Sequence, residues 1–220
     1  MNPWAKFEPA SCFPDKCQCE AALDAWVRQP SAFWSSLAYV FAAIGIYRHI
    51  KNKSIELKLW AISCMLIGFS SLFSHASFTR IALAFDFASI ILLLCFFSLI
   101  HLFQLIKLST FKILIYLMIF YGAFFFVMYT MNKYAKIAFC LIIFLFSLGD
   151  MVREMGINFF KAKTLQMALL IIGISFGVFI LDETHYKCDP YSLFQWHSIW
   201  HLGSALSIYY YGKWRFEVKI

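Results

Sequence analysis

The run LKLWAISCMLIGFSSLFSHASF at residues 57–78, followed after two residues by IALAFDFASIILLLCFFSLIHLFQLI at residues 81–106, decides the fold of this chain. Each run is long enough to cross a membrane, which takes about 20 apolar residues in a helix. Polar side chains nevertheless lie near the turn between them: Ser71 and His75 in the first run, and Asp86 in the second. Because ionisable groups inside transmembrane segments are costly and usually functional, the two runs predict a membrane-embedded helical hairpin that carries a site.

The rest of the composition extends this hairpin to a whole membrane bundle. Of 220 residues, 62% are hydrophobic and 14% are charged, with a mean hydropathy of +0.71, whereas soluble domains carry about 25% charged residues. We predict an all-α membrane protein, a seven-transmembrane-helix bundle with spans at residues 33–50, 57–78, 81–106, 111–131, 134–150, 164–181 and 193–212. Residues 1–32 would form an N-terminal extramembrane cap, and residues 33–220 the transmembrane domain. Gly173 and Gly177, four residues apart, predict close helix packing in the sixth span.

The net charge of +7 does not indicate a nucleic-acid partner, because Lys and Arg cluster at helix ends and form no stripe among soluble aromatic residues. The C-terminus and the loops expected on its side hold 12 Lys and Arg residues, against 7 on the other side. Since positive charge favours the cytoplasmic side, we predict a cytoplasmic C-terminus and an outward N-terminus. If the chain is bacterial, the expected location is the plasma (inner) membrane, with the site facing the outer side.

The positions of the cysteines suggest a disulfide. Four of them fall on the predicted outer side, where disulfides persist: Cys12, Cys17, Cys19 and Cys188. A bridge from Cys17 or Cys19 to Cys188 would clamp the cap onto the loop before the seventh span. The alternative is that Cys17-Gln18-Cys19 is a chelating pair for zinc, although no second pair matches it.

Three histidines indicate a metal site near the outer side. His197 and His201 stand at i and i+4, on one face of the seventh span. His75, near the outer end of the second span, lies at a similar depth and would supply a third nitrogen. Three protein ligands with a fourth position left for water are typical of catalytic zinc.

The neighbouring polar groups suggest acyl-bond hydrolysis. Asp86 could accept a proton from the attacking water and pass it to a leaving amine. Ser71, one turn before His75, could hold the water or donate to the developing oxyanion. The substrate would enter from lipid. Two alternatives are a seven-helix receptor-like protein with a structural zinc and a haem carrier with histidine axial ligands. The short inner loops disfavour the receptor, and two histidines one turn apart on one helix disfavour haem.

The pattern resembles the alkaline ceramidases, in particular their bacterial-type members, within a superfamily of seven-helix membrane hydrolases that includes adiponectin-receptor-like proteins. The resemblance covers nearly the whole chain. Its motifs are Ser71-x3-His75, Asp86 at the start of the next span, and His197-x3-His201 within QWHSIWHL at 195–202. Cys19-Glu20 and the stretch RQPSAFWSSLAY at 28–39 are similar to the same branch.

The resemblance implies zinc bound by His75, His197 and His201, with Asp86 and Ser71 positioning the nucleophilic water. It also implies an outward N-terminus, a disulfide between Cys19 and Cys188, and a zinc-dependent amidohydrolase that cleaves the N-acyl bond of ceramide or a related lipid amide. The products would be a fatty acid and a sphingoid-type amine. Hydrolysis of another acyl lipid is the alternative reaction.

The resemblance also raises a calcium site, because the eukaryotic alkaline ceramidases bind calcium through acidic and Asn residues in the N-terminal segment and in the residues leading into the first span. The carboxylates available here are those of Asp15, Glu20 and Asp24. The chain departs from the family pattern at the acidic position, which is Ala32, and at the Asn position, which is Ser35 or Ser36. Calcium prefers several hard oxygen ligands, and these departures leave fewer of them.

Overall fold

The computed structural model describes residues 2–10, 18–51, 54–131, 134–136, 138–143, 145 and 163–217. Its principal helices are α1 (Pro30–Ser35), α2 (Leu37–His49), α3 (Ile55–Ser77), α4 (Arg80–Leu105), α5 (Thr110–Thr130), α7 (Lys163–Glu183) and α8 (Trp196–Glu217). Within these described ranges there is no β-strand, only an isolated bridge between Pro9 and Thr79. The prediction of an all-helical chain is confirmed for this part.

Five segments are long and apolar enough to cross a membrane: Pro30–His49, which joins α1 and α2, and the helices α3, α4, α5 and α7. They coincide with five of the predicted spans and fit a multi-pass membrane protein. Helix α8 has 22 residues but is not among the five, since its histidines, serines and tyrosines lower its hydropathy. The predicted span at 134–150 lies partly outside the described residues.

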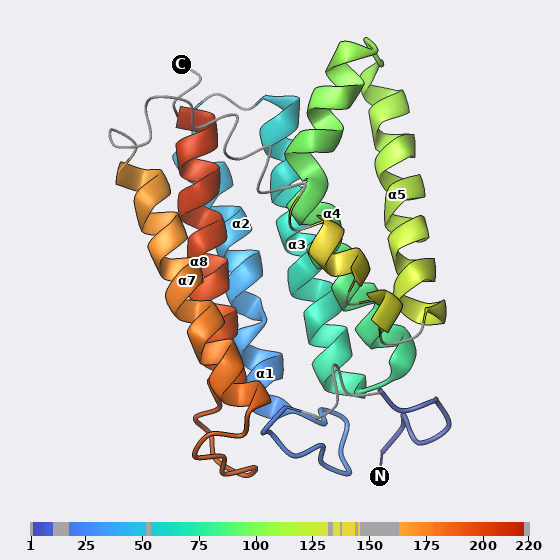
Figure 1. Ribbon diagram of the computed structural model, residues 1–220, viewed down its shortest axis with the longest axis vertical. Coiled ribbons are helices and arrows are strands. Elements are labelled where there is room, and N and C mark those ends of the chain that lie inside the picture. Colours follow the sequence, from blue (N-terminus) through green and yellow to red (C-terminus); the bar gives the residue numbers. More distant parts are fainter. Residues whose placement is uncertain are drawn as a thin grey trace.

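Figure 1 shows the helices running side by side, with α2, α7 and α8 on one side of the bundle and α3, α4 and α5 on the other. Helix α8 packs against both α7 and α2, and α2 also packs against α3, so α2 joins the two groups. The N-terminal segment and the loop between α7 and α8 lie at the same end of the bundle. We call this end the cap end.

The turn between α3 and α4 belongs to the cap end and fixes the position of His75 in the last turn of α3. Phe78 ends α3 in the left-handed region, with φ of 48°, and the Thr79 side chain then accepts a hydrogen bond from the N–H of Ala82. Backbone carbonyls in the last turn of a helix lack partners within that helix. Here the carbonyls of His75 and Ala76 accept hydrogen bonds from the backbone N–H groups of Gln29 (3.0 Å) and Arg28 (3.1 Å).

The N-terminus of α1 is capped by a side chain from an earlier segment of the chain. Pro30 occupies its first turn, as its missing N–H favours, and the preceding Gln29 makes no side-chain cap. Instead, the Glu20 carboxylate accepts the N–H groups of Ser31 at 2.6 Å and Ala32 at 2.9 Å. Burial raises the pKa of the Glu20 carboxyl, and these two hydrogen bonds act in the opposite direction. The cap segment is thereby tied to the beginning of the first span.

Helices α7 and α8 approach closely at Gly203. A Cβ atom placed there would lie 2.0 Å from the Ser175 hydroxyl oxygen, so α8 needs glycine at this crossing. The prediction that Gly173 and Gly177 mediate close packing is wrong for the described chain, in which no atom lies within 4 Å of a Cβ built at either position. The small residues of α7 that meet α8 lie on a different face, the one carrying Ser175.

Candidate metal centre

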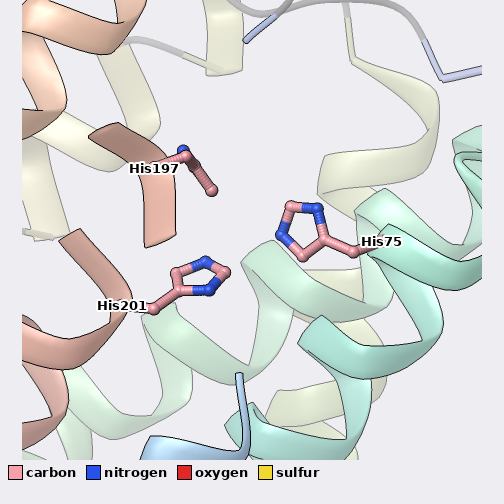
Figure 2. A group of neighbouring side chains, drawn as sticks. All are labelled: His75, His197 and His201. Carbon is pink, nitrogen blue, oxygen red and sulfur yellow. The ribbon is translucent and has the colours of Figure 1, made fainter. Parts of the chain in front are cut away.

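The side chains of His75, His197 and His201 lie together at the cap end of the bundle (Figure 2). Their ring centroids are 5.2 Å apart for His75 and His197, 5.0 Å for His75 and His201, and 4.6 Å for His197 and His201. One nitrogen from each ring lies within 4.8 Å of the other two. All three side chains are buried, with exposed fractions of 3 to 5%. Helices α3 and α8 thus bring three imidazoles to one point.

Gln29 fixes the orientation of His75. The Gln29 amide nitrogen donates to the backbone carbonyl of Glu20 at 3.1 Å. The amide oxygen therefore faces Nδ1 of His75, 2.8 Å away. Because this oxygen accepts only, the proton of a neutral His75 ring resides on Nδ1. Its Nε2 keeps a free lone pair, and this buried nitrogen has no hydrogen-bond partner.

His197 contacts polar groups through both nitrogens. Its Nδ1 lies 3.2 Å from a carboxylate oxygen of Asp182, a residue in the last turn of α7. The alignment falls short of a linear hydrogen bond, so the contact is chiefly electrostatic. On the other side, Nε2 of His197 lies 3.0 Å from the amide nitrogen of Gln18, which can only donate.

His201 is held by the start of the first span. Its Nδ1 lies 2.9 Å from the Ser35 hydroxyl and 3.2 Å from the carbonyl oxygen of Ala32. The Ser36 hydroxyl is 3.3 Å from the same nitrogen. A carbonyl accepts only, so these contacts favour a proton on Nδ1 here too.

In His75 and His201, Nδ1 therefore meets a protein partner, which leaves Nε2 for a ligand. In His197 the Gln18 amide occupies Nε2, so an ion bound there would displace that contact. Partners like those on Nδ1 orient metal-binding histidines and fix their tautomer. Three neutral imidazoles match the preferences of zinc and related first-row metals. The unpartnered Nε2 of His75 is a buried polar atom whose cost a bound cation would remove. On these grounds the residues present fit a zinc ion.

Ser71 joins the histidine group indirectly. It is buried in α3, and its hydroxyl lies 2.9 Å from that of Ser36, which in turn contacts His201. Asp86, in α4, is buried and its Oδ1 atom has no hydrogen-bond partner. No carboxylate oxygen of Asp86 belongs to the group of ligand atoms that lie within 4.8 Å of one another. Ser71 is therefore connected to His201 through Ser36, whereas Asp86 is not among the candidate metal ligands.

The carboxylates considered for calcium do not form a metal-binding group among the described residues. Both oxygens of Glu20 accept backbone N–H groups at the start of α1. Asp24 is exposed, and Asp15 lies outside the described residues. Calcium binding by these residues stays a prediction.

Cys19 and Cys188 form a disulfide, with an S–S distance of 2.04 Å and a Cα–Cα distance of 5.6 Å. This is the pairing that the family resemblance implies. It occupies the Cys19 sulfur, so the alternative in which Cys17 and Cys19 chelate zinc together does not fit this structure. Cys17 itself lies outside the described residues.

Sequence reasoning missed Gln18, Gln29 and Asp182. Asp182 follows an apolar run and reads as an interfacial acid, yet its exposed fraction is 0%. Gln29 precedes a proline and reads as a loop residue, yet its side chain reaches a histidine 46 positions away. One sequence feature could have identified Asp182. An acidic residue at the C-terminal end of a helix is disfavoured by the helix dipole, so its presence there indicates a compensating partner.

The chain matches no protein-family model, no curated protein and no solved structure.

Proposed function

We propose that this protein is an integral membrane, zinc-dependent amidohydrolase that cleaves the N-acyl bond of ceramide or a related lipid amide. The proposal includes membership of the alkaline ceramidase family, seven membrane spans, an outward N-terminus and a cytoplasmic C-terminus. The five apolar helices support the multi-pass arrangement, and the order of the histidine, serine and aspartate motifs supports the family.

The observation that carries the proposal is the buried, unpartnered Nε2 of His75, which faces two further imidazoles. Two of the three buried histidines have hydrogen-bond partners on Nδ1, and the third lies beside the Asp182 carboxylate. This arrangement is suited to a cation bound between the three rings. A bound zinc ion would polarise an acyl carbonyl and lower the pKa of water toward about 7. His75, His197 and His201 would hold it.

The remaining steps fall to the side chains nearby. Asp86 is a buried carboxyl with a free oxygen, outside the ligand group. It would accept the proton of the attacking water and deliver it to the leaving amine, so that the amide nitrogen departs as a neutral amine. The Ser71 hydroxyl would orient the water or donate to the carbonyl oxygen as charge develops there.

A lipid substrate agrees with the surroundings of the centre. The loop before α8 exposes Tyr191, Leu193 and Phe194 at the cap end, the last two with exposed fractions of 85% and 90%. Large exposed apolar side chains next to lipid-facing helices favour contact with the membrane interface. An amide at the junction of head group and acyl chain would lie at that level.

The test is incubation of the purified protein with a panel of N-acyl lipids, with and without a chelator, while fatty-acid release and bound metal are measured. Chelator-sensitive release, restored by zinc, is the expected result. Bound zinc without release from any lipid would support the receptor-like alternative, and release only from lipid esters would support the other acyl hydrolase. The absence of bound zinc would contradict all of these.

A further inference from the structure

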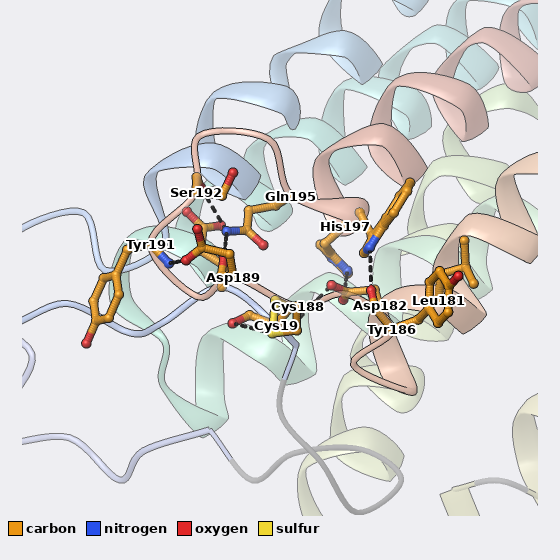
Figure 3. Close-up of a disulfide and its surroundings, with 12 residues drawn as sticks. Cys19, Leu181, Asp182, Tyr186, Cys188, Asp189, Tyr191, Ser192, Gln195 and His197 are labelled. Atoms are coloured by element: carbon orange, nitrogen blue, oxygen red, sulfur yellow. Dashed lines mark hydrogen bonds and ion pairs between the residues drawn. A yellow bond between two sulfur atoms is a disulfide. The ribbon is translucent and has the colours of Figure 1, made fainter.

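We propose that Asp182 is a positioning residue that selects the metal-binding tautomer of His197. The inference rests on the proposed zinc centre and adds to it a residue outside the motif set. Asp182 lies in the last turn of α7, and His197 lies in the first turn of α8. Figure 3 shows the carboxylate between the imidazole of His197 and the disulfide of Cys19.

Each oxygen of this carboxylate has its own neighbour. Oδ1 accepts the backbone N–H of Cys19 at 3.3 Å, and Oδ2 lies 3.2 Å from Nδ1 of His197. The contact is not a linear hydrogen bond, but the negative charge of a carboxylate beside Nδ1 favours the tautomer with its proton on that nitrogen. The opposite nitrogen agrees, because the Gln18 amide donates to Nε2. Both contacts favour an Nε2 without a proton, whose lone pair accepts from Gln18 and would exchange this donor for a metal ion.

The location of Asp182 indicates a functional reason for the charge. A carboxylate at a helix C-terminus is disfavoured by the helix dipole, and full burial adds a desolvation cost. Asp182 meets both conditions, with no exposed surface. The Cys19 N–H and the His197 ring offset part of this cost. A charge needed only for packing would not require this position.

If Asp182 selects the tautomer of His197 that carries its proton on Nδ1, Asp182→Asn should have a distinctive effect. The Cys19 N–H requires an acceptor, so the Asn oxygen takes the place of Oδ1 and the Asn NH₂ group faces His197. This group only donates, so Nδ1 must accept and the ring proton moves to Nε2. The lone pair that would bind metal is then lost. Asp182→Ala removes the carboxylate that favours the Nδ1 proton, but it does not force the proton onto Nε2.

The experiment measures zinc affinity of purified wild-type, Asp182→Asn and Asp182→Ala proteins by competition with a chromophoric chelator. We expect a loss of about 10- to 100-fold for Asp182→Asn, and a smaller loss for Asp182→Ala. A purely structural role predicts the reverse order, because Asn retains the hydrogen bond from Cys19. The matched control is Asp189→Asn, since Asp189 is exposed at the same end and contacts the N–H of Tyr191 instead. It should bind zinc as the wild type does.

A second measurement needs no folded variant at position 182. Nitrogen-15 spectra of histidine-labelled, metal-free wild type should show His197 protonated on Nδ1, with Nε2 bare, the signals being assigned with His197→Gln. The opposite tautomer, or an Asp182→Asn protein that binds zinc as tightly as the wild type or more tightly than Asp182→Ala, overturns this inference alone. A wild type that holds no zinc overturns the proposed function with it.

Discussion

The two ends of the bundle are stabilised in different ways. At the cap end, side chains of α1, α3, α7, α8 and the N-terminal segment meet through directional polar contacts around three histidines. Toward the opposite end, Trp60 packs against Phe96, Phe97 and Tyr211, with ring centroids 4.8 to 5.9 Å apart. Packing of this kind tolerates change of similar volume, whereas a polar network fails when one partner is lost. The comparison places the candidate metal centre in the part of the molecule that is most sensitive to single polar substitutions.

The strongest test of this division removes a proposed ligand. His75→Ala should lose zinc and reduce lipid-amide hydrolysis to the level of chelator-treated protein, because two histidines alone do not retain the ion at a three-ligand site. Metal content and fatty-acid release measure the effect. His101→Ala, a histidine elsewhere in α4, is the control and should retain both properties. Equal loss in the two variants would remove the distinction between the ends.

Asp86→Asn should separate chemistry from metal binding within the cap end. Loss of a general acid–base group costs about 10²- to 10⁴-fold in rate, so kcat should fall by this amount. Because Asp86 lies outside the ligand group, the variant should bind zinc as the wild type does. Loss of zinc in Asp86→Asn would instead make this carboxylate a ligand.

Glu20→Gln should reveal how far the cap segment depends on its polar contacts. The substitution leaves one acceptor for two N–H groups at the start of α1 and removes a charge at a helix N-terminus. We expect a loss of about 0.5–2 kcal/mol in unfolding free energy in detergent.

Asp24→Asn, an exposed change of the same kind in the same segment, should cost less than about 0.5 kcal/mol. Measuring both variants with and without calcium adds a second comparison. Stabilisation of the wild type by calcium that is absent in Asp24→Asn would support the calcium prediction for these carboxylates.

The smallest effect on the metal centre is expected from a substitution at the apolar end. Phe96→Leu replaces a fully buried ring that contacts Trp60 and Phe97. This large-to-small replacement in a packed cluster should cost about 0.5–3 kcal/mol in stability and leave zinc affinity unchanged. Thermal unfolding and chelator competition measure the two quantities. A large change in zinc affinity would show that the two ends are coupled.

The sequence predicts the ligand histidines better than their supporting partners. His197 and His201 follow from helical spacing, and the direction of each span places His75 at their depth. The partners follow no such rule, because Gln29 reaches His75 through a chain reversal and Asp182 reaches His197 across a loop. Their roles depend on how the cap folds onto the bundle, and polar residues at the edge of an apolar run do not encode this.

The helices were similarly predictable where hydropathy decides them. Helix α3 begins at Ile55 and ends at Ser77, within two residues of the predicted span. Helix α8 begins at Trp196, later than the predicted residue 193, because the Gln195 side chain donates to the loop carbonyls of Asp189 and Ser192. Hydropathy does not predict such a side-chain contact, so it does not predict the first residue of this helix.

The disulfide between Cys19 and Cys188, separated by 169 positions, makes the candidate centre depend on the redox state of the chain. The Cys19 residue that forms the bridge also donates its backbone N–H to Asp182. Reduction would release the N-terminal segment from the loop before α8 and free this backbone to move. A reducing agent should therefore weaken the candidate centre even though every histidine is still present.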